Sequence, residues 1–270
     1  MDTYQPRYEG TRWTIVYGAY RGIEAAAVDE LQRIVQSCQP YVVAVRPAAG
    51  FKPAAGEFPL YVGTPANNER IDELVRRKQL TLPQGREGYA VAVGSAPGKT
   101  GGRFMAVAGR DAKGVLNGVA DFGAKGVGKH VAPLVDNDRR ATFDRLPNLT
   151  FGGQPALENR GIWTWGYVIY DYRRFLDNMA RLKLNMLVIW NDCAPLNLAA
   201  VVRYAHARGI RVICGFHWGW GLNVTLSDAA ARKRIKAAVL AAYEKQYRDQ
   251  GIDGIYLQTV TEHAETERGG

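Results

Sequence analysis

The sequence has 270 residues, of which 47% are apolar and 23% charged, and its formal net charge is +9. This composition is typical of a soluble globular chain that buries a sizeable core in one large domain or two. No run of about 18 apolar residues exists, which excludes a membrane span, and the first residues lack a secretory signal, so we expect a cytoplasmic protein. The 35 basic residues are spread along the chain, which argues against a nucleic-acid-binding protein.

The sequence lacks the common metal and cofactor motifs. Cys38, Cys193 and Cys214 are widely spaced and form no CxxC pair, so they indicate neither a disulfide framework nor a zinc site. We interpret them as small core residues. The turn Gly98-Lys99-Thr100 does not complete a phosphate-binding loop, because Val93 stands where that pattern needs glycine. We therefore expect no metal and no cofactor.

Residues 12–135 alternate strand and helix signals. Runs of β-branched and aromatic residues predict strands, and apolar residues at helical spacing predict helices. The predicted strands are 12–20, 41–45, 60–62, 89–93 and 104–108, and the predicted helices are 23–35, 67–78 and 111–122. A turn rich in glycine separates the last two strands, which predicts a hairpin. We assign residues 1–150 to a small α/β domain.

From Glu158 the pattern becomes a strict repetition of strand and helix. The predicted strands are 161–165, 185–190, 210–216 and 252–259. The first helix follows Asp171, and its apolar face consists of Tyr172, Phe175, Leu176, Met179 and Leu182. The second begins at Pro195 and ends at Gly209. The third has Ser227 as its N-cap, ends at Gly251, and turns one face inward, consisting of Ile235, Ala238, Val239 and Ala242.

Repetition of this kind predicts neighbouring parallel strands joined by right-handed crossovers. We assign residues 151–270 to a partial, four-stranded (β/α) barrel of the TIM type, so the fold class is α/β with a small N-terminal α/β domain. A complete barrel takes roughly 250 residues. We therefore expect the chain to be a fragment of a longer enzyme, or else to cover its open barrel edges by self-association.

The residues that end the predicted barrel strands are rich in aromatic and hydrogen-bonding side chains. They are Trp163 and Trp165, then Trp190-Asn191-Asp192, His217-Trp218-Gly219-Trp220, and Thr261-Glu262-His263. In parallel α/β folds, ligands meet the carboxyl ends of strands. Flat tryptophans beside polar groups suit a sugar, whose ring has apolar faces and a rim of hydroxyls.

Each of these residues also has a structural interpretation. Trp163 or Trp165 alone is equally consistent with barrel packing, Asp192 with a cap on the helix near Pro195, and His217 with a core histidine. Glu262 is the hardest to explain structurally, because it follows an apolar strand at the edge where the others converge.

Several segments resemble known carbohydrate-active enzymes. Arg160-Gly161, residues 179–185, Trp190-Asn191-Asp192 and residues 204–210 are similar to the first half of the barrel in family 20 glycoside hydrolases. Gly88-Tyr89 and residues 111–118 look like the α/β domain that precedes the barrel in families 20 and 67.

This resemblance implies roles for two residues. Arg160 matches the family 20 arginine that holds sugar hydroxyls, and Glu262 matches the general acid of both families. Family 20 places an aspartate directly before that glutamate, and this chain has Thr261 there. The departure makes an α-glucuronidase-like relative more attractive than an N-acetylhexosaminidase.

The sequence therefore predicts a glycoside hydrolase with Glu262 as catalytic acid, and Arg160, Trp163, Trp165, Asp192, His217 and Trp218 as substrate-binding residues. Its partner is a carbohydrate, with neither nucleic acid nor membrane involved. The alternative is a non-catalytic carbohydrate-binding protein or an inactive truncated homologue. A barrel enzyme of another class, such as an isomerase or aldolase, is a third interpretation.

Overall fold

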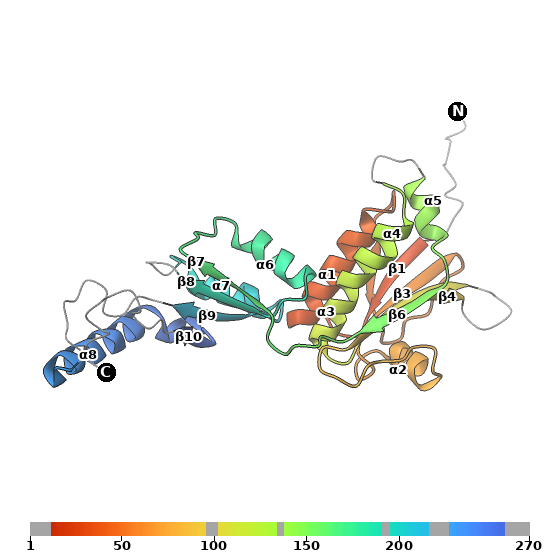
Figure 1. Ribbon diagram of the computed structural model, residues 1–270. Helices are drawn as coiled ribbons and strands as arrows, with labels where there is room; N and C mark the ends of the chain where they lie inside the picture. Colours follow the sequence, from red (N-terminus) through yellow and green to blue (C-terminus); the bar gives the residue numbers. More distant parts are fainter. Residues whose placement is uncertain (1–11, 96–101, 134–137, 191–194, 216–226, 257–270) are drawn as a thin grey trace, which may run out of the picture. The chain divides into compact units, whose positions relative to one another are not determined.

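The computed structural model describes residues 12–95, 102–133, 138–190, 195–215 and 227–256 (Figure 1). Contacts within the chain divide it into two compact units, Met1–Glu158 and Asn159–Gly270. Both units alternate strands and helices, one around a mixed sheet of six strands and the other on a parallel sheet of four. The predicted fold class is confirmed. No helix in the described ranges is long and apolar enough to cross a membrane.

The sheet of the first unit has the order β2-β1-β3-β5-β4-β6. Its strands are β1 (Arg12–Tyr17), β2 (Ala44–Pro47), β3 (Glu57–Gly63), β4 (Tyr89–Ser95), β5 (Arg103–Gly109) and β6 (Leu149–Gly153). β1, β2, β3 and β5 are parallel, whereas β4 pairs antiparallel with β5 and β6. The predicted pairing of β4 with β5 is confirmed. β6 was not predicted, because its sequence LTFGG has little strand character and depends on β4 for its partner.

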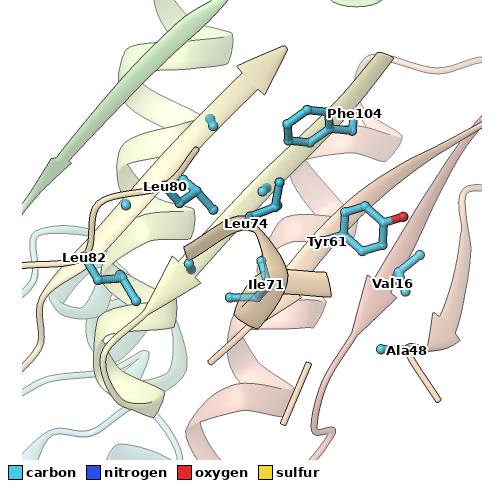
Figure 2. Close-up of a cluster of buried hydrophobic side chains, with 12 residues drawn as sticks. Val16, Ala48, Tyr61, Ile71, Leu74, Leu80, Leu82 and Phe104 are labelled. Carbon is cyan, nitrogen blue, oxygen red and sulfur yellow. The ribbon is translucent and has the colours of Figure 1, made fainter. Parts of the chain in front are cut away.

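Helices cover both faces of this sheet. They are α1 (Gly22–Gln36), α2 (Glu69–Arg76), α3 (Ala112–Asp121), the π-helical turn η1 (Phe122–Val127), α4 (Gly128–His130) and α5 (Arg139–Asp144). α1 and α3 lie side by side (Figure 1). α2 packs on the opposite face, where Ile71 and Leu74 join a buried cluster with Val16, Tyr61 and Phe104 (Figure 2).

The second strand begins later than predicted, at Ala44 rather than Tyr41. The side chain of Gln36 binds the backbone before it: Nε2 donates to the Tyr41 carbonyl at 2.7 Å, and Oε1 accepts from the Val43 N–H at 2.9 Å. These backbone groups are therefore engaged by the end of α1, and pairing with β1 begins only afterwards.

Two asparagines join the carboxyl ends of β1 and β3, where the chain changes direction across the sheet. The Asn68 amide, 1% exposed, donates to the carbonyls of Val16 and Val62 at 3.1 Å each, and its oxygen caps α2. The side chain of Asn67 reaches Gly18, where a Cβ atom would lie 2.1 Å from Oδ1. Glycine is required there because the amide fills the space that a larger side chain would need.

The second unit contains a four-stranded sheet in the order β10-β9-β8-β7. Its strands are β7 (Gly161–Trp165), β8 (Met186–Trp190), β9 (Arg211–Gly215) and β10 (Gly254–Tyr256), and every pairing is parallel. The connecting helices are α6 (Tyr172–Arg181), α7 (Leu198–His206) and α8 (Ala229–Gln246), the last followed by the 3₁₀ turn η2 (Arg248–Gln250). The predicted set of four neighbouring parallel strands is confirmed for these residues.

Helix ends in this unit differ from the predictions. α7 begins at Leu198 rather than Pro195, after a turn in which the Leu198 N–H donates to the Pro195 carbonyl at 3.1 Å. The N-cap of α8 is Asp228, not Ser227, because the Asp228 carboxylate accepts from the Ala230 N–H at 2.9 Å.

Two predicted apolar faces are shorter than expected. Leu182 is 69% exposed because it follows the last turn of α6 as its C-cap. On α8, burial is confined to Ala231 and Ile235, and Ala238 is exposed. An alanine carries little apolar surface, so leaving it exposed costs little.

Candidate functional site

The carboxyl ends of the four parallel strands carry a row of residues in register. Trp165 of β7 pairs with Trp190 of β8, Trp190 with Gly215 of β9, and Gly215 with Tyr256 of β10. Side chains alternate between the two faces of a sheet, so residues in one row project from the same face. Trp163, two residues before Trp165, joins them there.

These aromatic residues form one cluster, hereafter the aromatic cluster: Trp163, Trp165, Trp190 and Tyr256. The indoles of Trp165 and Trp190 are stacked, with centroids 5.9 Å apart and planes 14° from parallel. Trp163 meets Trp165 edge to face at 4.9 Å and 77°, and Tyr256 meets Trp190 at 5.7 Å and 83°. Each geometry is among those that aromatic pairs prefer.

Gly215 allows the aromatic cluster to form. A Cβ atom at Gly215 would lie 2.1 Å from Cε3 and 2.9 Å from Cζ3 of Trp190. The indole of Trp190 therefore lies across the backbone of Gly215 and reaches Tyr256 on the next strand. Any larger residue at this position would displace the ring.

The aromatic cluster has a buried member, Trp190, and two half-exposed members, Trp163 and Trp165. Trp190 is only 7% exposed, whereas Trp163 and Trp165 are 46% and 45% exposed. The opposite face of the sheet, against which α7 packs, is closed by buried side chains, namely Leu187, Ile189, Val212 and Cys214. The two tryptophans thus present apolar ring surface on the face opposite α7, and Trp190 stacks on Trp165 beneath it.

Titratable side chains at the buried face have raised pKa values. Burial raises the pKa of the Cys214 thiol to about 12, so the thiolate that a nucleophile needs is disfavoured. Burial likewise raises the pKa of Tyr172, which faces the same region from α6, to about 12. Cys38 in the first unit is also buried, and its pKa is raised by desolvation. The interpretation of Cys38 and Cys214 as core residues is confirmed, and Cys193 lies outside the described residues.

Arg160 does not join the aromatic cluster. It precedes β7, so the whole strand, about 16 Å at 3.3 Å per residue, separates it from Trp165. Its Nε donates to the Lys183 carbonyl at 2.9 Å, and its N–H donates to Asn185 Oδ1 at 2.9 Å. Arg160 therefore braces the turn between α6 and β8 at the amino edge of the sheet, and this position does not support its predicted contact with sugar hydroxyls.

Four predicted site residues, Asp192, His217, Trp218 and Glu262, lie outside the described residues. Two described residues, Tyr256 and Gly215, belong to the site and were not predicted. The register of four strands connects them with Trp165 and Trp190, and a single sequence does not specify this register. The available signal was that Tyr256 lies in the apolar run Gly254-Ile255-Tyr256-Leu257 of the last predicted strand. No group of three metal-ligating side chains converges within the described ranges.

A cavity of about 470 Å³ lies beside β7. β7 is the last strand of the sheet order, so within the described ranges its outer edge has no strand partner. The cavity is bounded by β7, by the segment that follows it and by α6, and its lining consists of Ile162, Trp163, Thr164, Tyr167, Val168, Ile169, Tyr170, Asp171, Arg174, Phe175 and Asn178. Trp163 therefore belongs to both the cavity and the aromatic cluster.

Comparisons with known proteins support the fold. No protein-family model matches the sequence, and no curated protein does. The solved structure of CpGH84D, a glycoside hydrolase family 84 protein, is similar over 91% of this chain, with a TM-score of 0.57 and 13% sequence identity. The fold is therefore similar to that of CpGH84D. The chain spans 40% of the length of that structure. The likeness to CpGH84D gives no support to the resemblance to families 20 and 67 seen in the sequence.

Proposed function

We propose that the chain is a glycoside hydrolase that binds its sugar on the exposed rings of Trp163 and Trp165. One observation carries the proposal: two half-exposed tryptophans, supported by Trp190, lie at the carboxyl edge of a parallel sheet in a glycoside hydrolase-like fold. Ligands of parallel α/β folds bind at this edge. The apolar face of a pyranose ring packs on such rings, and its hydroxyls remain free to bind polar neighbours.

The predicted polar residues follow the aromatic cluster closely in the sequence. Asp192 comes two residues after Trp190, His217 two residues after Gly215, with Trp218 next, and Glu262 six residues after Tyr256. This spacing supports a shared site. In the proposed reaction, Glu262 donates a proton to the oxygen of the leaving group while the bond from that oxygen to the sugar breaks, and the oxygen of a water molecule ends on the sugar carbon in its place. Asp192 is the candidate second carboxylate. The resemblance to families 20 and 67, with Thr261 in place of the family 20 aspartate, implies a uronosyl substrate.

Binding is tested with free sugars and methyl glycosides of glucuronic acid, N-acetylglucosamine, glucose and xylose, followed by isothermal titration calorimetry. Trp165→Ala removes the ring face that contacts the sugar, so we expect about tenfold weaker binding or more. The matched control is Tyr20→Ala, which removes a 51% exposed aromatic side chain from the first unit. Equal affinity in the two variants, or no binding by the unaltered protein, would overturn the proposed platform.

Turnover is tested with aryl glycosides of the sugar that binds best. Glu262→Gln removes the transferable proton, so turnover of substrates with poor leaving groups falls by about 10²–10⁴-fold, while activated aryl glycosides lose less. Equal losses on both substrate types contradict the role of general acid.

The second candidate is a non-catalytic carbohydrate-binding protein, because stacking of a sugar on the exposed rings of Trp163 and Trp165 needs no catalytic carboxyl group. Sugar binding without turnover of any aryl glycoside would establish this alternative.

A further inference from the structure

We infer that the cavity beside β7 binds an apolar group attached to the sugar, such as an aryl or alkyl aglycone. This inference rests on the proposed function, and it narrows the ligand class to glycosides with an apolar leaving group.

The walls of the cavity are mainly apolar. Phe175 of α6 and Ile162 of β7 line one side, and the segment after β7 contributes Val168, which is 58% exposed. Tyr167 and Tyr170 in the same segment are 79% and 95% exposed. When a ligand covers apolar surface at a concave site, that surface leaves contact with water and the free energy of the complex is lowered.

Three polar side chains in the lining already make hydrogen bonds within the protein. The Asp171 carboxylate accepts from the Arg174 N–H at 2.9 Å and thereby caps α6. Thr164 Oγ1 donates to the Val188 carbonyl at 3.2 Å, and Asn178 Oδ1 accepts from Arg181 at 2.9 Å. These bonds occupy part of the polar surface, and the rest of the exposed lining is mainly apolar, so an apolar occupant fits better than a second sugar unit.

Trp163 is shared by the cavity and the proposed sugar platform. This indole stands edge to face against Trp165, with planes 77° apart, and also lines the cavity. A sugar that rests on Trp165 therefore has the cavity next to it, across Trp163. A volume of about 470 Å³ is in the usual range for small-molecule sites and suits one or two rings.

The test compares the methyl and phenyl glycosides of the sugar that binds best, again by calorimetry. We expect the phenyl glycoside to bind about tenfold to hundredfold more tightly, because its ring is transferred from water into an apolar cavity. Val168→Asp places a carboxylate in the cavity wall at a position exposed enough to tolerate it. We expect this variant to bind both glycosides with equal affinity, and to bind the methyl glycoside as the unaltered protein does. Leu240→Asp, on a 50% exposed leucine of α8, is the matched control and keeps the preference.

Each other outcome has a definite meaning. If methyl and phenyl glycosides bind equally to the unaltered protein, this inference fails and the proposed function stands. If neither binds, both fail. A phenyl preference that survives Val168→Asp assigns the apolar group to another place. If gel filtration shows a dimer that Val168→Asp dissociates, the cavity seats a second copy of the chain instead of an aglycone.

Discussion

Replacing Gly215 by alanine tests whether the aromatic cluster depends on a missing side chain. The new Cβ atom would lie 2.1 Å from Trp190 Cε3, more than 1 Å closer than the 3.4 Å at which ordinary contacts begin. The indole cannot yield freely, because Trp165 stacks on it and Tyr256 packs against its edge. Overpacking of this kind costs about 1–3 kcal/mol, and loss of two aromatic pairs at about 0.5–1.5 kcal/mol each gives the same range.

Gly254→Ala is the matched control in the neighbouring strand. A Cβ atom there would meet only Ile213, at 3.7 Å or more, which is ordinary contact. We expect Gly254→Ala to change stability by less than about 1 kcal/mol, with stabilisation favoured because alanine restricts the unfolded chain. Amide hydrogen exchange in β8 and β9 gives the local free energy of opening for both variants. Equal values would refute the packing argument, as would sugar affinity in Gly215→Ala equal to that of the unaltered protein.

Two further predictions concern stability. Asn68→Ala should lower the free energy of unfolding of the first unit by about 2–4 kcal/mol, measured by urea denaturation, because it removes the α2 cap and the donors to Val16 and Val62. Asn197→Ala, at an N-cap whose side chain makes no capping bond, should leave the free energy of unfolding nearly unchanged. Equal losses in the two variants would contradict this account. Burial raises the pKa of Tyr172 to about 12 from an ordinary value near 10, so its neutral form stabilises the fold below pH 10 and this contribution is lost as the pH rises from about 10 to 12. Urea midpoints at pH 8 and pH 11 should therefore differ less in Tyr172→Phe than in the unaltered protein, and an identical pH dependence would disprove the assignment.

The sequence predicted the elements whose local pattern is strong. The run Asn185 to Trp190 is almost wholly apolar, as a strand buried between layers requires, and it became β8. Trp163 and Trp165 occupy alternate positions of one strand, so their common face followed from the two-residue period alone. Because the two-residue period and the predicted strand order agree, the carboxyl edge of the sheet was predictable, and with it three of the four residues of the aromatic cluster.

The remaining features depend on partners distant in the sequence. β6 forms because β4 offers it an edge, and Gly215 matters only because the Trp190 ring lies across it. Arg160 could be assigned to a strand start, but the direction of its guanidinium toward the Lys183 carbonyl depends on a turn 23 residues away. Side-chain direction and register are properties of the folded neighbourhood, which a local pattern does not contain.

The asparagine pair between β1 and β3 bears on how the first unit can be redesigned. In open α/β sheets, the crevice where the strand order reverses is the usual seat of a nucleotide or similar ligand. In this unit the side chain of Asn67 occupies the corresponding position. Its Oδ1 accepts from the Thr64 N–H at 3.0 Å, and its Nδ2 donates to Glu24 at 2.6 Å. The amide thus acts as a built-in ligand. Trimming it to glycine would leave a small chamber with one carboxylate acceptor and one backbone donor already in place, a starting point for an engineered receptor in the unit that does not carry the aromatic cluster.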